Sequence, residues 1–532
     1  MSLGWGGALF LVFLLALGVR LYQVRHILYP AWVDSYHHTI ITQIVLDTGR
    51  VPVGYRPFAP LDSFHYHFGF HAYSAFVGWI TGLPAHRAVL LGGQVLNALT
   101  VPSLFFFVDR LTKDRRAALF SGAMAGLVCR MPAYYVNWGR YTQLAGQVLL
   151  PVALAFTVEA CQAKEKREQW RKAFLASLLA GGLLLTHYRV AIFYIVGVGI
   201  FGLSKVLRGR RTGQVLLCLG AIGLLVLFWI GPWLFSLLRK TISVAQQVRR
   251  TVPKGQQYDY LTLEFVLGYG LRLPVLLLSG LAAIWLLARV TVRPLGGLIL
   301  LWLAAMFFLA NPVLSGIPSG FLPNGTVIVA LYLPASLLVG LAVGDAWSLL
   351  DGKCRKNWPR WGAKLSLAGF GLLVLVASIL GTRGILAHGL EPWRYLVSSA
   401  DLQAMRWIEK NVPQDALFAV TGEFWLPTAV AGADAGLWLP YIAHRQTLIP
   451  PMIYISEADE HFIEQVNRTV RGLLQADSAQ ALARALWQVG AGYIYLGRRS
   501  PENWHALLED SRYFQCLYAI DDVRVYQLKG VP

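Results

Sequence analysis

The chain has 532 residues, of which 56% are hydrophobic and 14% charged, and its formal net charge is +19. Soluble domains carry about 25% charged residues, so this composition excludes an ordinary soluble protein. The lack of a charge-rich low-complexity tract excludes a disordered one. Apolar runs recur as far as residue 387, and runs of about 20 residues are long enough to cross a bilayer core of about 30 Å. The sequence therefore predicts a polytopic membrane protein.

The positive charge lies mostly in short loops between the apolar runs, and no nucleic-acid-binding motif is present. We therefore expect membrane lipids as partners, and no nucleic acid. The five cysteines are scattered, without the spacing of a metal site or a disulfide framework.

Eleven apolar runs are expected to span the membrane, at about 4–28, 88–108, 117–136, 143–162, 173–187, 190–204, 214–238, 263–288, 295–311, 326–349 and 365–387. If only these runs span, five basic loops fall on one side: 109–116, 164–172, 205–211, 289–293 and 353–364. Lys and Arg are enriched on the cytoplasmic side of membranes. This topology therefore predicts a cytoplasmic N-terminus and a C-terminal region outside.

One further segment, 66–83 (YHFGFHAYSAFVGWITGL), is apolar enough to span. Counting it would move every later basic loop outside, so we interpret it as a re-entrant or membrane-surface segment packed against protein. His67 and His71 lie one helical turn apart, which favours a protein-facing side. A missed partner span nearby is the alternative.

The chain is expected to divide into a transmembrane domain, 1–388, and a soluble extracytoplasmic domain, 389–532, whose composition changes. The second part shows a helix at 401–411, a strand at 416–420, helices around 457–475 and 478–489, and strands at 491–496 and 523–528. Strands that alternate with helical patterns predict a small α/β domain.

The first outer loop, about 29–65, carries the first candidate site. Asp34 follows span one in the stretch WVDSYHH; if it starts a helix, His37 and His38 follow at i+3 and i+4. Two readings are open. The stretch is either a helix cap among interfacial aromatics, or a general base or metal ligand whose pKa is adjusted by burial and neighbours. Residues 39–46 (TIITQIVL) are expected to form an amphipathic helix along the membrane surface.

Five histidines gather in this part of the chain: His37, His38, His65, His67 and His71. His is the commonest metal ligand, but no spacing here matches a metal motif such as H-E-x-x-H. We therefore expect hydrogen-bonded or interfacial His. A divalent metal is the less favoured alternative, and the cofactor stays unknown.

Two other outer stretches carry candidate substrate-binding residues. Arg140 and Tyr141 lie among aromatics in YYVNWGRYTQ; Arg at a membrane rim can bind phosphate bidentately, and an aromatic belt with a snorkelling Arg is the alternative. His187 and Arg189 form a hairpin tip, THYR, which faces either a ligand or an aqueous cavity.

Two basic features do not fit the simple topology. Arg249 and Arg250 belong to a basic loop, 239–262, on the outer side. Either the topology is wrong there, or the loop binds an anionic lipid head group, and its Gly and Gln residues indicate mobility.

Arg130 lies deeper in a span and needs a protein partner, because a charge at mid-bilayer costs ~2.5–3.5 kcal/mol or more.

Taken in chain order, these features resemble the GT-C glycosyltransferases, a group that includes protein-mannosyl, aminoarabinose and oligosaccharyl transferases of bacteria and archaea. The resemblance rests on Asp34 in the first outer loop, the surface helices after it, and the segment YHFGFHAY. It continues through a short outer loop after span three, an outer α/β domain and the stretch 433–450 (ADAGLWLPYIAHRQTLIP). Two departures stand out: Asn137 and Arg140 occupy the second outer loop, where many members have a second acid, and the WWDYG signature is absent.

The resemblance implies transfer of a sugar from a polyprenyl-phosphate donor to an acceptor hydroxyl on a protein, lipid or glycan, at the outer face of the plasma membrane. Asp34 would be the general base, with Asp62 in reserve, and His37 and His38 would orient Asp34 or hold an ion. Arg140, Arg189 or the basic loop would stabilise the departing phosphate. The departures make en bloc glycan transfer to Asn and a metal-dependent mechanism unexpected. Two alternatives remain open: a transporter or flippase of lipid-linked glycans, and a non-catalytic scaffold on the same fold.

Overall fold

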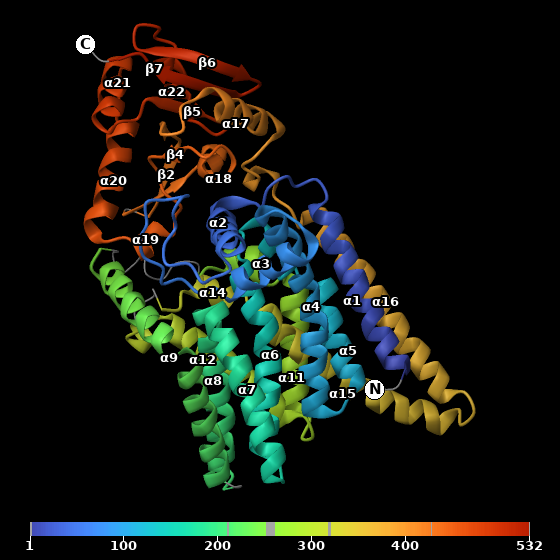
Figure 1. Ribbon diagram of the computed structural model, residues 1–532. Helices are drawn as coiled ribbons and strands as arrows, with labels where there is room; N and C mark the ends of the chain where they lie inside the picture. The colour runs from blue at the N-terminus through green and yellow to red at the C-terminus, as the bar shows by residue number, and fades with distance from the viewer. Residues whose placement is uncertain (1–2, 210–211, 252–260, 318–320, 427, 531–532) are drawn as a thin grey trace. The chain divides into compact units, whose positions relative to one another are not determined.

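The computed structural model describes residues 3–209, 212–251, 261–317, 321–426 and 428–530 (Figure 1). Within these ranges the side chains of residues 3, 240–241, 243–251 and 426 are not described. The chain forms two compact units. We call them the helical unit (Met1–Arg25, Leu91–Val136 and Tyr141–Leu390) and the mixed unit (His26–Leu90, Asn137–Arg140 and Glu391–Pro532).

The helical unit is built from long helices. In chain order these are α1 (Leu3–Val24), most of α4 (Ala85–Thr112), α5 (Arg115–Ala123), the π-helical turn η1 (Met124–Val128), α6 (Tyr141–Gln162), α7 (Lys166–Thr186), α8 (Tyr188–Leu207), α9 (Thr212–Thr251), α10 (Leu263–Phe265), the π-helical turn η4 (Val266–Gly270), α11 (Leu273–Ala288), α12 (Arg293–Ala310), α13 (Pro312–Ser315), α14 (Asn324–Ile328), α15 (Tyr332–Asn357) and α16 (Gly362–His388). A short 3₁₀ helix, η2 (Ala133–Asn137), leads from this unit into residues 137–142, which we call the second outer loop after the topology expected from the sequence.

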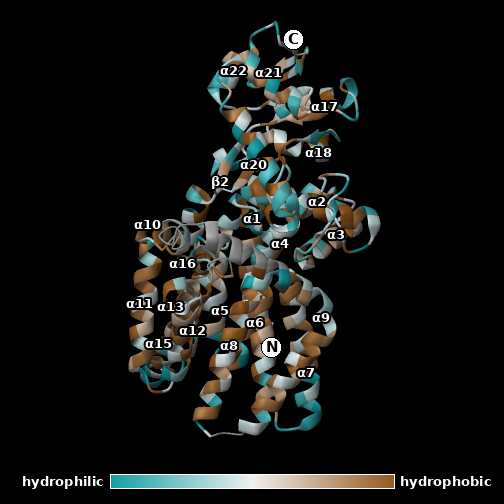
Figure 2. Ribbon diagram, turned by 90° about the vertical axis from the view of Figure 1, so that its left-hand side faces the viewer, coloured by the Kyte–Doolittle hydropathy of each residue, from teal (hydrophilic) through white to brown (hydrophobic). Residues whose placement is uncertain are grey.

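Eight helices among the described residues are long and apolar enough to cross a membrane, or nine if η4 and α11 are one bent span. Hydrophobic residues predominate along these long helices in Figure 2. The expected eleven runs are all helical, but two do not qualify. Run 117–136 is divided between α5 and η1, and the helix over run 173–187, α7, begins with a charged turn. The multi-pass α-helical membrane fold is confirmed, with fewer qualifying spans than expected.

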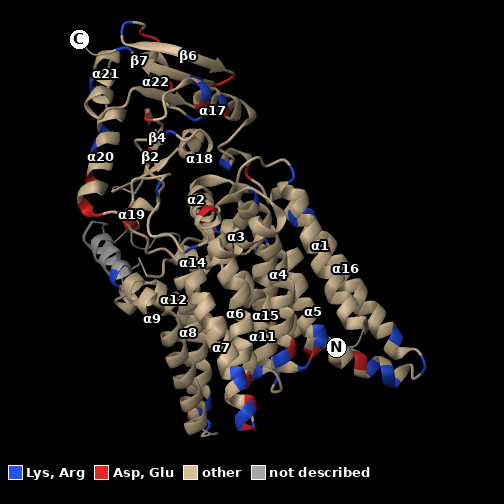
Figure 3. Cartoon of the chain, in the orientation of Figure 1, with Lys and Arg blue, Asp and Glu red and all other residues tan. Residues whose placement is uncertain are grey.

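Charge in the helical unit is concentrated at helix ends (Figure 3). Lys and Arg gather at the α4–α5, α6–α7 and α15–α16 turns, while the stretches between are nearly free of charge. The exception that the sequence indicated, Arg130, has the protein partners it needs: it donates to the Gly268 carbonyl, and its guanidinium lies 4.1 Å from the Tyr134 ring centroid.

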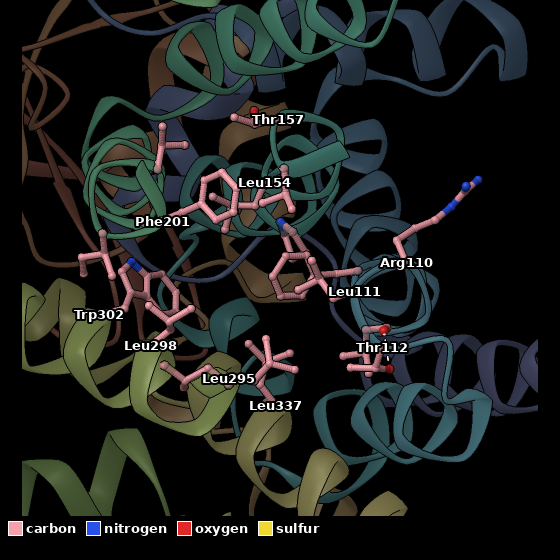
Figure 4. A pocket seen from close by; sticks show the side chains of 18 of the residues that line it. Arg110, Leu111, Thr112, Leu154, Thr157, Phe201, Leu295, Leu298, Trp302 and Leu337 are labelled. Carbon is pink, nitrogen blue, oxygen red and sulfur yellow. Dashed lines mark hydrogen bonds between the residues drawn. The ribbon is translucent and has the colours of Figure 1, made fainter. Parts of the chain in front are cut away.

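An apolar cavity of about 280 Å³ lies in the helical unit between α4, α6, α8, α12 and α15 (Figure 4). Leucine is the commonest residue in its lining, and the rings of Phe107, Phe201 and Trp302 also face it. Arg110, Lys205 and Arg208 also border it, and they come from the last turn of α4 and the end of α8. The cavity is therefore at the other end of α8 from the hairpin tip at residues 186–189.

The mixed unit joins the first outer loop to the C-terminal residues. Its helices are α2 (Trp32–Thr48), α3 (Gly69–Thr81), η5 (Pro392–Arg394), α17 (Ser399–Asn411), η6 (Ala435–Trp438), α18 (Leu439–Ile442), α19 (Tyr454–Glu457), α20 (Glu460–Leu474), α21 (Ala479–Gln488) and α22 (Glu502–Leu508). Its strands are β1 (Leu417–Ala419), β2 (Gly422–Leu426), β3 (Ala429–Gly432), β4 (Gln446–Thr447), β5 (Tyr493–Leu496), β6 (Phe514–Ile520) and β7 (Val523–Leu528).

The strands of the mixed unit form one mixed sheet and one separate hairpin. The five-stranded sheet has the order β4-β1-β5-β7-β6, with β1 parallel to β4 and β5, and β7 antiparallel to β5 and β6. β2 and β3 pair antiparallel. The predicted α/β architecture of the C-terminal residues is confirmed. The units, however, group residues 26–90 and 137–140 with the C-terminal part rather than with the spans.

Helix α2 belongs to the core of the mixed unit. Twelve of its 17 residues are buried, and its apolar side chains join one cluster with those of the C-terminal domain; the Tyr36 ring meets the Trp438 ring at 5.2 Å. The expected membrane-surface helix over 39–46 is therefore wrong. Its apolar face is covered by protein from the far end of the chain.

Helix α3 accounts for the ambiguous segment 66–83. It has 13 residues, a length of about 20 Å, which is too short to cross a core of about 30 Å. His67 and His71 are 3% and 0% exposed, so the predicted protein-facing side is confirmed. Phe76, Trp79 and Ile80 form its exposed apolar side.

The basic segment after residue 239 is not the loop that was expected. α9 continues as a helix through Thr251, because KTISVAQQVRRT contains no Gly or Pro and can extend the preceding helix. Arg249 and Arg250 lie in this extension, but their side chains are outside the described residues, as is the segment 252–260.

Candidate active site

Asp34 lies in the first turn of α2, where the helix dipole favours a negative charge. It is half-buried, although every other residue from Ala31 to Ile40 is buried. Its carboxylate makes no hydrogen bond or ion pair with the residues that the structure describes. A helix capped by Asp34 would begin at Ser35, but α2 begins about one turn earlier, and its N-cap, Ala31, makes no side-chain cap bond. The helix-cap interpretation is therefore wrong.

Asp62, the second candidate base, is differently placed. Its carboxylate is exposed and bonded to the guanidinium of Arg56 at 2.6 Å. This hydrogen bond and charge lower the pKa of Asp62. A carboxylate that is already paired and has a lowered pKa is a weaker base than an unpaired one.

The histidines after Asp34 do not hold its carboxylate. His38 Nδ1 lies 2.9 Å from His71 Nε2, and the two ring nitrogens of His37 are buried without a hydrogen-bond partner among the described residues. Burial lowers the pKa of His37, although the charge of Asp34 opposes that shift, and burial also lowers the pKa of His71. Burial therefore favours the neutral form of the His37 and His71 imidazoles. Among the described residues, no three His, Cys, Asp or Glu side chains gather as a metal site.

The second outer loop packs on the first turn of α2. Gly139, with φ +66°, brings its backbone against Ser35, where a Cβ atom would lie 2.7 Å from the Ser35 nitrogen. Arg140 follows directly, and its guanidinium lies 5.1 Å from the Trp138 ring centroid. The fold therefore brings Arg140 and Asp34 onto adjoining segments of one unit. Only glycine permits so close an approach at a positive φ.

Three more of the predicted substrate-binding residues lie in the helical unit, where each makes contacts within the protein. Tyr141 is 1% exposed, and its ring packs closely against Gly93. His187 is the N-cap of α8, where its Nδ1 accepts a hydrogen bond from the Val190 amide at 3.3 Å. Arg189 lies over the Tyr188 ring at 5.3 Å.

Glu457 is a buried acid that the sequence did not reveal as part of this region. Its carboxylate, 1% exposed, accepts hydrogen bonds from the His65 amide at 2.9 Å and the Tyr55 hydroxyl at 3.3 Å, and contacts His65 Nδ1 at 2.9 Å. Burial raises the pKa of Glu457. The contact joins the end of the first outer loop to α19, nearly 400 positions later in the chain. No local signal in the sequence marks such a pair.

The fold is similar to those of several solved membrane proteins. One is the archaeal oligosaccharyltransferase AglB from Archaeoglobus fulgidus, solved with an inhibitory peptide and a dolichol-phosphate; it matches with a TM-score of 0.64 and 13% identity, over 93% of this chain and 69% of that chain. ArnT from Cupriavidus metallidurans in the apo state matches at 0.56 and 14%, over 98% of each chain. Arabinofuranosyltransferase AftD from Mycobacteria matches at 0.60 and 15%, over 100% of this chain and 40% of that chain. No curated protein matches the sequence.

These similarities define a GT-C membrane fold: a polytopic helical part with a small sheet region at the C-terminus. The chain belongs to a family described as a family of unknown function, DUF6541, whose profile matches residues 2–528.

Proposed function

We propose that this protein is a glycosyltransferase that moves a sugar from a polyprenyl-phosphate-linked donor to an acceptor hydroxyl, with Asp34 as the general base. The reaction takes place at the outer face of the plasma membrane, with the N-terminus in the cytoplasm. The named solved relatives include an oligosaccharyltransferase and an arabinofuranosyltransferase, and AglB was solved with a dolichol-phosphate. Fold similarity does not fix activity, so the proposal depends on the chemistry of the site.

The observation that carries the proposal is the state of Asp34. It is a half-buried acid in the first outer loop that no described residue pairs. The buried acids nearby in the mixed unit are committed to structure: Asp434 and Glu457 each accept several hydrogen bonds. A general base needs an available carboxylate within reach of a substrate hydroxyl, and Asp34 is the acid that meets this requirement.

In the proposed step Asp34 accepts the proton of the acceptor hydroxyl. The hydroxyl oxygen forms a bond to the anomeric carbon of the donor sugar, and the bond from that carbon to the phosphate oxygen breaks. The electron pair leaves with the polyprenyl phosphate, whose new charge a guanidinium can stabilise by bidentate contacts. Arg140, which directly follows the turn that packs on α2, is the proposed phosphate ligand.

The cavity near Arg110 and Lys205 is not assigned to the donor phosphate in this scheme. It borders the same helix ends as the basic turns, and the proposed topology has these turns on the cytoplasmic side because Lys and Arg are enriched there. In this scheme the acceptor hydroxyl meets Asp34 within the mixed unit.

Sugar transfer in isolated membranes tests the proposal. Labelled polyprenyl-phosphate sugars are the donors, and Asp34→Asn is compared with wild type at matched protein levels. Loss of a general base lowers the rate by about 10²–10⁴-fold, and we expect a loss in this range. Asp47→Asn, at the exposed end of the same helix, is the control and is expected to leave the rate unchanged.

Three outcomes contradict the proposal. Equal transfer by Asp34→Asn and wild type refutes the role of Asp34, and collapse in Asp62→Asn instead moves that role to Asp62. Movement of a lipid-linked glycan across vesicle membranes by folded protein, without transfer from any donor, favours a flippase. If the folded protein neither transfers a sugar nor moves a lipid-linked glycan, the result favours a non-catalytic scaffold.

A further inference from the structure

Three tryptophans gather at the first turn of α2. Trp32 is 8% exposed, and its ring meets those of Trp393 and Trp425 edge-on, at centroid distances of 5.2 and 6.5 Å. Trp393 and Trp425 are 53% and 43% exposed. The cluster therefore has one buried and two exposed indole rings, all within the mixed unit.

The backbone of Trp32 is strained. Its φ is +66°, a conformation that bulky L-residues rarely adopt. Such strain persists only where surrounding contacts hold the residue, and it is concentrated at ligand sites and other functional positions. The packing of the unit, rather than the local preference of the chain, sets the position of the Trp32 ring.

Two guanidinium groups lie on this cluster and differ in charge balance. Arg394 is 7% exposed, lies 4.0 Å from the Trp393 ring centroid and is neutralised by Glu391 at 2.6 Å. Arg499 lies 5.3 Å from the Trp32 ring centroid and 5.8 Å from that of Trp393, but no acid among the described residues pairs with it. Its Nη1 atom is buried without a hydrogen-bond partner, which is unfavourable unless a ligand supplies the acceptor.

Arg499 is presented by a fixed turn. The buried carboxylate of Asp434 accepts hydrogen bonds from the Gly497 amide at 3.1 Å and the Ser500 hydroxyl at 3.0 Å. Ser500 Oγ is also 2.8 Å from Thr421 Oγ1. Because residues on both sides of Arg499 are bonded to the same buried acid, the guanidinium is positioned before any ligand arrives, which reduces the entropy lost on binding.

We propose that this cluster is the acceptor subsite and that it takes an anionic saccharide, a sugar that carries a carboxylate or a phosphate group. The electron-rich face of an indole attracts the C–H groups of a sugar ring, and Trp393 and Trp425 offer two such faces. Carboxylate and phosphate oxygens match the fork of a guanidinium such as Arg499. Trp32 and Asp34 lie two residues apart in the first turn of α2, so the subsite and the general base are presented by the same turn of one helix. The inference rests on the proposed function and names the class of its acceptor.

Oligosaccharide binding to the purified full-length protein tests this subsite without any transfer reaction. The probes are a fluorescent uronic-acid oligosaccharide, a phosphorylated oligosaccharide and a neutral glucan of equal length. A charged hydrogen bond to Arg499 predicts that at least one acidic probe binds about tenfold more tightly than the neutral one. That preference should fall as the salt concentration rises. The two acidic probes distinguish a carboxylate from a phosphate ligand.

The variants separate the roles of the two kinds of side chain. Arg499→Gln is expected to abolish the preference for acidic probes, and Trp393→Ala is expected to weaken the binding of acidic and neutral probes alike. Arg498→Gln, which changes the exposed neighbour, is the matched control and leaves binding unchanged. Arg499→Lys keeps the charge but not the planar fork and gives an intermediate affinity. The thermal unfolding midpoint of each variant reports whether it is folded.

Equal binding of acidic and neutral probes contradicts the inference, as does a full acidic preference in folded Arg499→Gln. Tighter binding of a peptide than of any saccharide also overturns it. If these results appear while transfer still depends on Asp34, the acceptor class is wrong and the proposed function stands. If the acidic saccharide binds through Arg499 but no donor supports transfer, the subsite stands and the proposed function fails.

Discussion

Glu457 fastens the first outer loop to the C-terminal part of the mixed unit, and its removal should release that loop. In Glu457→Ala the Tyr55 hydroxyl, which is 0% exposed, and the His65 amide both lose their acceptor. An unsatisfied buried donor costs about 1–3 kcal/mol. His65 is partly exposed and can turn to water, so most of the cost falls on Tyr55, and we expect local opening to become easier by about 3 kcal/mol.

Hydrogen exchange measures this change where it occurs. Each 1.4 kcal/mol is about tenfold in an equilibrium, so the amide of His65 should exchange about 100-fold faster in Glu457→Ala when exchange follows local opening. Glu457→Gln keeps a carbonyl acceptor, and burial already disfavours the Glu457 charge by raising its pKa. We therefore expect only about tenfold faster exchange in that variant.

The two Glu457 variants separate the effect of the buried hydrogen bonds from that of the carboxylate charge. An exchange rate at His65 that is unchanged in Glu457→Ala would show that the buried hydrogen bonds do not hold the loop. Equally faster exchange in Glu457→Ala and Glu457→Gln would show that the charge of Glu457, rather than the hydrogen bonds that it accepts, holds the loop in place. Amides of α21, in the separate cluster around Leu482, should not change in either variant.

Two further predictions follow from buried contacts of the mixed unit. Burial raises the pKa of Asp434 to about 6, so between pH 4 and pH 6 the folded state holds a proton that the unfolded state releases. The stability that this proton contributes is fully present below pH 4 and is lost as the pH rises through 6. Between pH 4 and pH 7 the free energy of unfolding of the wild type should therefore fall by up to about 3 kcal/mol relative to that of Asp434→Asn. Thermal unfolding midpoints measure this change, and parallel pH profiles of the two proteins would contradict it. Gly139→Ala should destabilise more than Gly49→Ala in thermal unfolding, because both glycines have positive φ but only Gly139 has Ser35 in the place of a Cβ. The expected difference is about 1–3 kcal/mol from overlap alone, and equal losses would show that the second outer loop is free to move away from α2.

Much of the fold follows from local patterns in the sequence. Length and apolarity located every long helix of the helical unit. The need of Arg130 for a protein partner followed from the cost of a charge in the bilayer. The strands at 491–496 and 523–528 were predictable as short apolar segments that alternate with helical patterns, and they occur as β5 and β7. Such features depend on neighbours within about 20 residues, which a single sequence contains.

The long-range contacts could not be predicted in this way. The pattern at 39–46 has an apolar face, but nothing near it shows that residues of the C-terminal domain cover that face, so a membrane surface was the natural partner to expect. The bonds of Glu457 with His65 and the approach of Arg499 to Trp32 join segments that only the tertiary fold brings together. Asp34 was identified from its place after span one, and the structure adds that it has no described partner, while Asp62 is paired.

The most direct test of the central claim is the single-turnover transfer rate of Asp34→Asn with a defined polyprenyl-phosphate sugar. If Asp34 is the general base, the chemical step slows by about 10²–10⁴-fold while the KM for the donor stays close to the wild-type value, because the variant keeps the shape of the site. A wild-type rate of the chemical step in folded Asp34→Asn would contradict the account.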